Sequence, residues 1–133
     1  MDHISVDLRG SEISDIKLEQ GRFELTFSRA YLIKTMTGSL EKTRWWQAGA
    51  LVIEEAELEG VAPGGPQRCA GGDIEDNIYT YRDMVPVPLE SRGRVGCRLQ
   101  LQGVAEPLIV SGTAIRLEMQ DVPKYIEHIR PDA

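Results

Sequence analysis

The sequence predicts a single all-β domain over residues 1–133, an antiparallel barrel or tight sandwich of about seven to eight strands with a short C-terminal helix. Apolar and polar residues alternate with period two along much of the chain, which is typical of half-buried antiparallel strands. Clear helical spacing occurs only near the C-terminus. Leu, Ile, Val and Phe make up about a quarter of the 133 residues, enough for a buried core.

The clearest strands lie in the first and last thirds of the chain. In residues 22–28 three apolar side chains alternate with polar ones, and Gln20 and Gly21 predict a tight turn from an earlier strand at residues 13–18. Residues 94–102 alternate in the same way. Their apolar positions are Val95, Cys97, Leu99 and Leu101. We expect each of these strands to bury one face.

Two further segments change the phase of their alternation. The first changes phase at Glu54 and Glu55, and the second at Ser111 and Gly112. A strand that swaps faces after one extra residue contains a β-bulge, and glycine favours that geometry. We therefore expect two bulged strands and a strongly coiled sheet.

A short helix of about two turns is expected near the C-terminus. Asp121 is a suitable N-cap residue, and Pro123 lies near the first turn. Tyr125, Ile126 and Ile129 then follow at helical spacing. The helix would lay its apolar side chains over an open end of the sheet.

Residues 60–72 contain five Gly and two Pro and predict a long glycine-rich loop. Loops of this length are often binding loops or disordered segments. We expect this loop to be irregular and mobile, because its few apolar side chains offer little to offset the entropy of ordering.

The charge and the termini exclude several classes of protein. Fifteen basic and 21 acidic residues give a net charge of −6, which is unlike a nucleic-acid-binding domain. The N-terminal residues do not resemble a signal peptide, and the longest apolar run, residues 48–53, is too short to cross a membrane. We expect a cytoplasmic protein with two free thiols, Cys69 and Cys97, and no cofactor.

Three carboxylates provide a candidate metal site. Asp73, Glu75 and Asp76 follow the glycines directly and supply oxygen ligands that suit a hard cation. The segment is not a calcium-binding EF-hand loop, because Ile78 stands where that loop requires glycine. A metal-dependent enzyme that uses these carboxylates is one alternative function.

Two adjacent tryptophans and two arginines are the candidate contact residues. Neighbouring residues of a strand point to opposite faces, so one of Trp45 and Trp46 is expected in the core and the other outside. Tryptophan is enriched among the residues that dominate binding energy. Arg94 and Arg98 lie on the polar face of their predicted strand and could contact a ligand or a partner.

The sequence therefore favours a small, soluble, non-enzymatic binding or interaction module. A second alternative is a small-molecule-binding β-barrel with residues 60–72 and a tryptophan at its mouth. An acidic strand, residues 54–59, and an arginine-rich strand, residues 92–98, also predict a homodimer joined by opposite charges around a tryptophan. If these two strands pair within one subunit, a monomer is expected instead.

Overall fold

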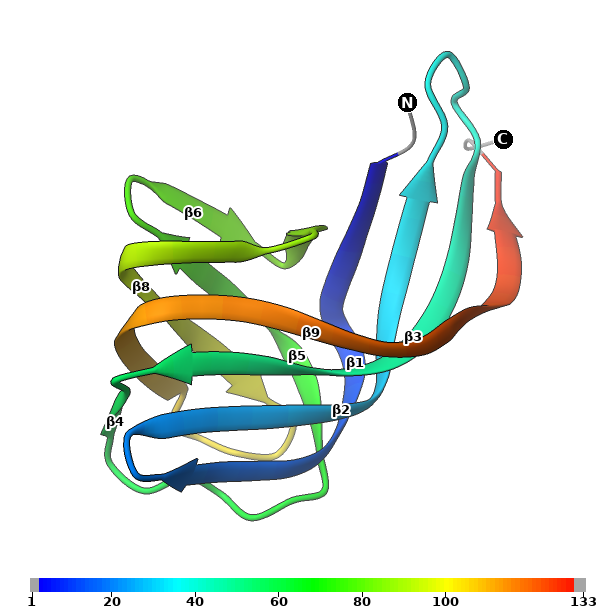
Figure 1. The fold of residues 1–133 in the computed structure, drawn as a ribbon. Helices are drawn as coiled ribbons and strands as arrows, with labels where there is room; N and C mark the ends of the chain where they lie inside the picture. Colours follow the sequence, from blue (N-terminus) through cyan, green and yellow to red (C-terminus); the bar gives the residue numbers. More distant parts are fainter. Residues whose placement is uncertain (1–2, 131–133) are drawn as a thin grey trace.

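The computed structural model describes residues 3–130, which form nine strands and no helix (Figure 1). The strands are β1 (His3–Glu19), β2 (Arg22–Thr35), β3 (Lys42–Glu54), β4 (Glu57–Glu59), β5 (Gln67–Asp76), β6 (Tyr79–Arg82), β7 (Met84–Val87), β8 (Glu90–Leu101) and β9 (Leu108–Ile129). Every pairing is antiparallel, so the predicted all-β antiparallel class is confirmed.

The strands form one sheet with the order β6-β5-β8-β9-β3-β2-β1-β7, and β4 pairs with β9. A further pairing joins β5 to β1, where Glu12 lies opposite Arg68 and Ile13 opposite Gln67. Because β5 and β1 stand far apart in the strand order, this contact curls the sheet back on itself. We call the curled part the body.

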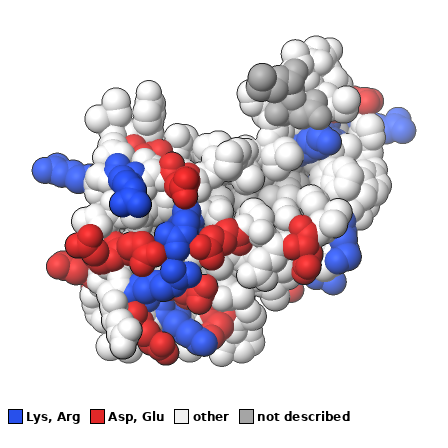
Figure 2. All heavy atoms as spheres, viewed as in Figure 1, with Lys and Arg blue, Asp and Glu red and all other residues white. Residues whose placement is uncertain are grey.

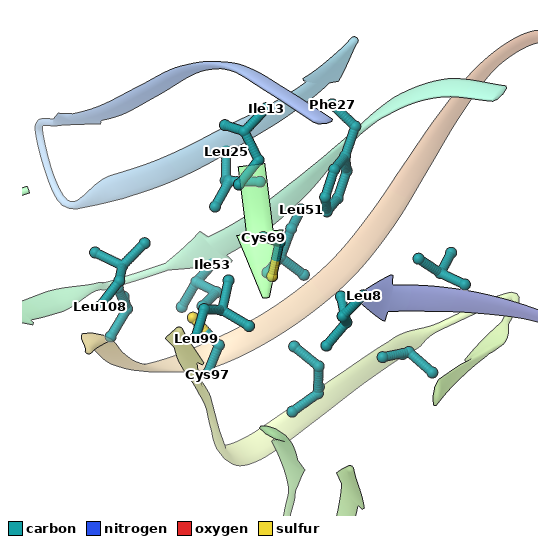
Figure 3. Packing of buried hydrophobic residues seen from close by; sticks show 14 of the residues in the cluster. Leu8, Ile13, Leu25, Phe27, Leu51, Ile53, Cys69, Cys97, Leu99 and Leu108 are labelled. Atoms are coloured by element: carbon teal, nitrogen blue, oxygen red, sulfur yellow. The ribbon is translucent and has the colours of Figure 1, made fainter. Parts of the chain in front are cut away.

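The core fills the inside of the body (Figure 3). Phe23, Leu25 and Phe27 of β2 are all at most 1% exposed, whereas the residues between them are partly exposed. The four apolar positions predicted for β8 are likewise buried. The predicted alternation is confirmed in both strands, because local period-two patterning directly reports which face is covered.

Four long strands leave the body and form a second region, which we call the extension. It consists of the start of β1, the end of β2, the start of β3 and the end of β9 (Figure 1). The pairing register shifts between Asp7 and Glu12, between Phe27 and Ala30, and opposite Trp46 and Ala48. Bulges bend a strand and increase its twist, so these irregularities account for the bend between the two regions.

The two predicted phase changes lie opposite each other. Glu54 pairs with Ala114 and Glu57 with Ser111, so two residues lie between these pairs on each side, residues 55–56 and residues 112–113. These two segments therefore form no bulge against each other; the register shift at this point lies between β8 and β9, where Arg92 pairs with Ala114 and Val95 with Gly112. Gly112 has no room for a Cβ atom, which would collide with the Glu54 carbonyl oxygen.

The predicted C-terminal helix is wrong, because residues 121–129 belong to β9. Asp121 is not a helix cap; its φ of 62° is left-handed and falls where the register with β3 shifts. Tyr125 pairs with Trp45 of β3 instead of packing along a helix. Pairing with a distant strand has overridden a weak local helical signal.

The glycine-rich loop is shorter than predicted, because residues 67–72 lie in β5 and only residues 60–66 connect β4 to β5. Gly71 and Gly72 have φ values of 134° and 151°, which other residues rarely adopt. These glycines allow a close approach between backbones within the sheet, a use of strand glycine that composition does not distinguish from a flexible loop.

Candidate binding site on the extension

One face of the extension carries a row of apolar side chains that continues the core outward. In the pairing register Leu32 lies opposite Trp45, and Trp45 lies opposite Tyr125. Ile4 and Trp45 also pack against the buried cluster. The extension has no second layer over this face in residues 3–130, so part of its apolar surface stays open to solvent.

Trp45 is held in place from several sides. Its ring meets that of Tyr125 edge to face, with centroids 5.3 Å apart and planes at 79°. Its indole Nε1 donates a hydrogen bond to Thr43 Oγ1 at 2.8 Å. Lys34 Nζ lies 5.8 Å from the ring centroid. With its polar atom satisfied, the ring presents a fixed apolar surface.

A pocket of about 160 Å³ opens beside the Trp45 ring. It is lined by Ile4, Leu32, Lys34, Trp45, Val122 and Pro123. Val122 is 76% exposed and marks the open side. An apolar cavity of similar volume, about 150 Å³, holds a benzene molecule in another protein, so this pocket suits one aromatic or branched aliphatic group.

Trp46 lies on the other face, as predicted for adjacent strand residues. It pairs with Tyr31 on β2 and Lys124 on β9. The Arg29 guanidinium carbon lies 4.4 Å from its ring centroid, and Lys124 Nζ lies 4.6 Å from it. Two cations therefore occupy the neighbourhood of this ring, which makes Trp45 the better candidate for an apolar contact.

The structure does not bring the two candidate arginines to the tryptophans. Arg94 and Arg98 lie on β8 in the body and are exposed. The Arg94 backbone N–H donates to Asn77 Oδ1 at 3.0 Å, which ties β8 to the turn after β5. Arg98 pairs with Asp73 of β5. Both arginines therefore contact neighbouring parts of the body, and neither lines the pocket beside Trp45.

The three candidate metal ligands do not converge. Asp73 accepts a hydrogen bond from Arg82 Nε at 2.9 Å, and this contact lowers the pKa of the Asp73 carboxyl group. Asp76 accepts a hydrogen bond from Ser91 Oγ, whereas Glu75 is exposed. Within residues 3–130, no three His, Cys, Asp or Glu side chains form a group that could hold a metal ion.

The first residue of the acidic strand, Glu54, finds its partners inside the subunit. Glu54 Oε2 lies 3.3 Å from Arg22 Nη1 and 3.0 Å from Arg116 Nη2, and Arg116 Nε lies 2.7 Å from Glu118. Figure 2 shows interleaved basic and acidic side chains on this face of the body. Sequence reasoning missed Arg22 and Arg116, because neither belongs to the arginine-rich strand.

The acidic and arginine-rich strands are second neighbours within one subunit. Both β4 and β8 pair with residues 109–111 of β9. With Glu54 already paired, the charge argument for a dimer through these two strands loses much of its basis. The homodimer itself stays a prediction.

Both thiols are buried, and Cys69 lies in β5 rather than in the predicted glycine-rich loop. Burial raises the pKa of Cys69 from 9.0 to about 11 and that of Cys97 from 9.0 to about 12. Neither thiol is activated as a nucleophile.

We predict that iodoacetamide at pH 8 modifies neither Cys69 nor Cys97 in the folded protein and modifies both in denaturant, as read by mass spectrometry. Above pH 9 the two thiols stay protonated in the folded protein but lose their protons in the unfolded chain. The free energy of unfolding should therefore also fall as the pH rises from about 9 to 11. Rapid labelling of the native protein would contradict the buried positions.

Comparisons with protein-family models, curated proteins and solved structures give no match for this chain. No helix in residues 3–130 is long and apolar enough to cross a membrane. Any functional conclusion must therefore come from the chemistry of the surface, and the pocket beside Trp45 is the best-defined feature there.

Proposed function

We propose that this protein is a non-enzymatic binding module whose contact surface is the apolar face of the extension. The observation that carries this proposal is the pocket beside Trp45, which is open, apolar and large enough for one side chain. A partner that inserts an aromatic or branched aliphatic group there would remove apolar surface of both molecules from water.

Preorganisation supports this surface as a binding site. Thr43 and Tyr125 fix the Trp45 ring before any partner arrives. Binding then costs little side-chain entropy, and a larger share of the burial energy appears as affinity. A tryptophan at the centre of an apolar face is also the usual composition of an interface hot spot.

The alternative of a small molecule inside a barrel has less support. We infer that the body is a barrel rather than a sandwich, since the β5–β1 pairing joins two distant strands of the sheet order. Its interior, however, is filled with side chains such as Leu99 and Ile53, both 0% exposed. The pocket beside Trp45 is also smaller than the roughly 300–1,000 Å³ of typical ligand sites.

The cytoplasm remains the compartment we propose. Cys69 and Cys97 are free thiols, and unpaired cysteines are usual in reducing compartments.

The proposal predicts that a small aromatic probe contacts Trp45 and leaves Trp46 unaffected. N-acetylphenylalaninamide, added at about millimolar concentration as expected for so small a ligand, should shift the Trp45 indole N–H signal in a ¹H–¹⁵N spectrum. The Trp46 signal, on the other face, serves as the internal control. Trp45→Phe and Trp46→Phe assign the two signals.

Val122→Asp should weaken this binding at least about tenfold, because it places a charge at the open side of an apolar pocket. Ile78→Asp is the matched control, since Ile78 is 89% exposed and lies in the turn between β5 and β6. Equal shifts of both indole signals, or no shift of either, would refute the pocket as the binding site.

A further inference from the structure

The second half of β9 is a free edge of the sheet. Residues 118–129 pair with β3 on one side, while β8 leaves β9 at Arg116. No strand within residues 3–130 covers the other side. Tyr125 and Ile126 on this edge are 54% and 38% exposed. A free edge with exposed apolar side chains is a template for pairing with another chain.

A bulge gives this edge an unusual charge arrangement. Arg44 of β3 pairs with Glu127 and Trp45 with Tyr125, so Ile126 is an extra residue in β9. Lys124 pairs with Trp46, which lies on the same face of β3 as Arg44. Lys124 and Glu127 therefore project from one face, although they are three positions apart in the sequence. In a regular strand they would project from opposite faces.

We propose that two copies of this chain pair edge to edge through β9, antiparallel and related by a two-fold axis between Tyr125 and Ile126. Lys124 then lies opposite Glu127 of the partner subunit, and the symmetry forms this ion pair twice. Tyr125 lies opposite Ile126 of the partner subunit and supplies apolar contact at the centre.

Charge complementarity favours this register over two of the alternatives. Centring the two-fold axis on Lys124 or on Glu127 would bring like charges together, which disfavours those alternatives. Glu127 forms no ion pair with another residue of the described chain, so it is available to a partner. Asp121 and Arg130 extend the pattern, since they also stand opposite each other in the proposed register.

The paired segment is short. Pro123 has no N–H to donate, and the bulge at Ile126 interrupts a regular ladder. We therefore expect a dimer of about micromolar affinity. Tyr125 shares a face with Trp45, so pairing would join the apolar faces of two extensions into one continuous surface.

The test is a charge swap followed by sedimentation velocity between about 1 and 100 µM, the range that brackets the expected affinity. Lys124→Glu and Glu127→Lys should each weaken self-association at least about tenfold, because each creates two like-charge pairs. The double variant Lys124→Glu/Glu127→Lys should regain the dimer, because it restores both ion pairs in reverse. Glu106→Lys, in the turn between β8 and β9, is the control and should leave the dimer intact.

A wild type that stays monomeric throughout this range would overturn the proposal. So would a dimer that the single reversals do not weaken, or a double variant that does not recover. Thermal unfolding of each variant shows whether it is folded. N-acetylphenylalaninamide binding to the Lys124→Glu monomer tests the pocket separately, because that site lies within one subunit.

Discussion

Leu99→Ala is expected to lower the free energy of unfolding by about 2–5 kcal/mol, the range for deleting a fully buried leucine side chain. Leu99 is 0% exposed and lies among apolar side chains from several strands of the body (Figure 3). Because buried side chains of several strands pack in the same cluster, we expect the site to collapse little around the cavity. Equilibrium denaturation in urea measures the effect.

The neighbouring residue provides the control. Gln100 is exposed on the other face of β8, so Gln100→Ala should change stability by no more than about 0.5 kcal/mol. Equal losses from the two substitutions would mean that both faces of β8 are buried, which the curled sheet does not allow.

Gly72→Ala is expected to cost at least about 2 kcal/mol, because it combines backbone strain with overpacking. Gly72 has a φ of 151° and lies opposite Leu99. A Cβ atom there would come within 2.8 Å of the Leu99 Cα and collide with the Arg98 carbonyl oxygen. Both obstacles are backbone atoms, so the strands would have to separate. Thermal and urea unfolding report the loss.

Gly64→Ala is the matched control, since Gly64 has open space around it and no left-handed φ. This substitution should be neutral or slightly stabilising, because alanine has less freedom to lose on folding. If the Gly72→Ala protein were as stable as the Gly64→Ala protein, the placement of residues 67–72 in β5 would be contradicted. These residues would then behave as the flexible loop that composition alone predicts.

The body could be predicted because its strands follow a local rule. Phe23, Leu25 and Phe27 alternate with polar residues, and the alternation itself reports the buried face. The strand order and the β5–β1 contact could not be predicted, since they depend on pairings between residues far apart in the chain.

The missed end of β9 has a specific physical cause. Tyr125 and Ile126 lie three and four residues after Val122, and Ile129 lies four and three residues after them, a spacing that imitates a helix. Register shifts opposite Trp46 and Arg44 add residues to β9 and stretch its normal period of two. Bulges are therefore easily mistaken for helical spacing when only one strand of the pair is considered.

The candidate site was predicted in part. The opposite orientations of Trp45 and Trp46 follow from strand geometry, and the structure confirms them. The pocket beside Trp45 could not be predicted, because it needs Ile4 and Val122 from opposite ends of the chain. Arg94 and Arg98 lie away from this pocket, on β8 of the body, and their role in contacts stays a prediction.

The central claim is that the extension, rather than the body, makes the contacts of this protein. Hydrogen–deuterium exchange of the wild type at about 1 and 100 µM tests it most directly, because self-association responds to concentration by mass action. The account predicts slower exchange in residues 118–129 at the higher concentration and no change in β6, the strand that ends the sheet order in the body. Exchange that is unchanged in residues 118–129, or that slows in the body instead, would contradict it.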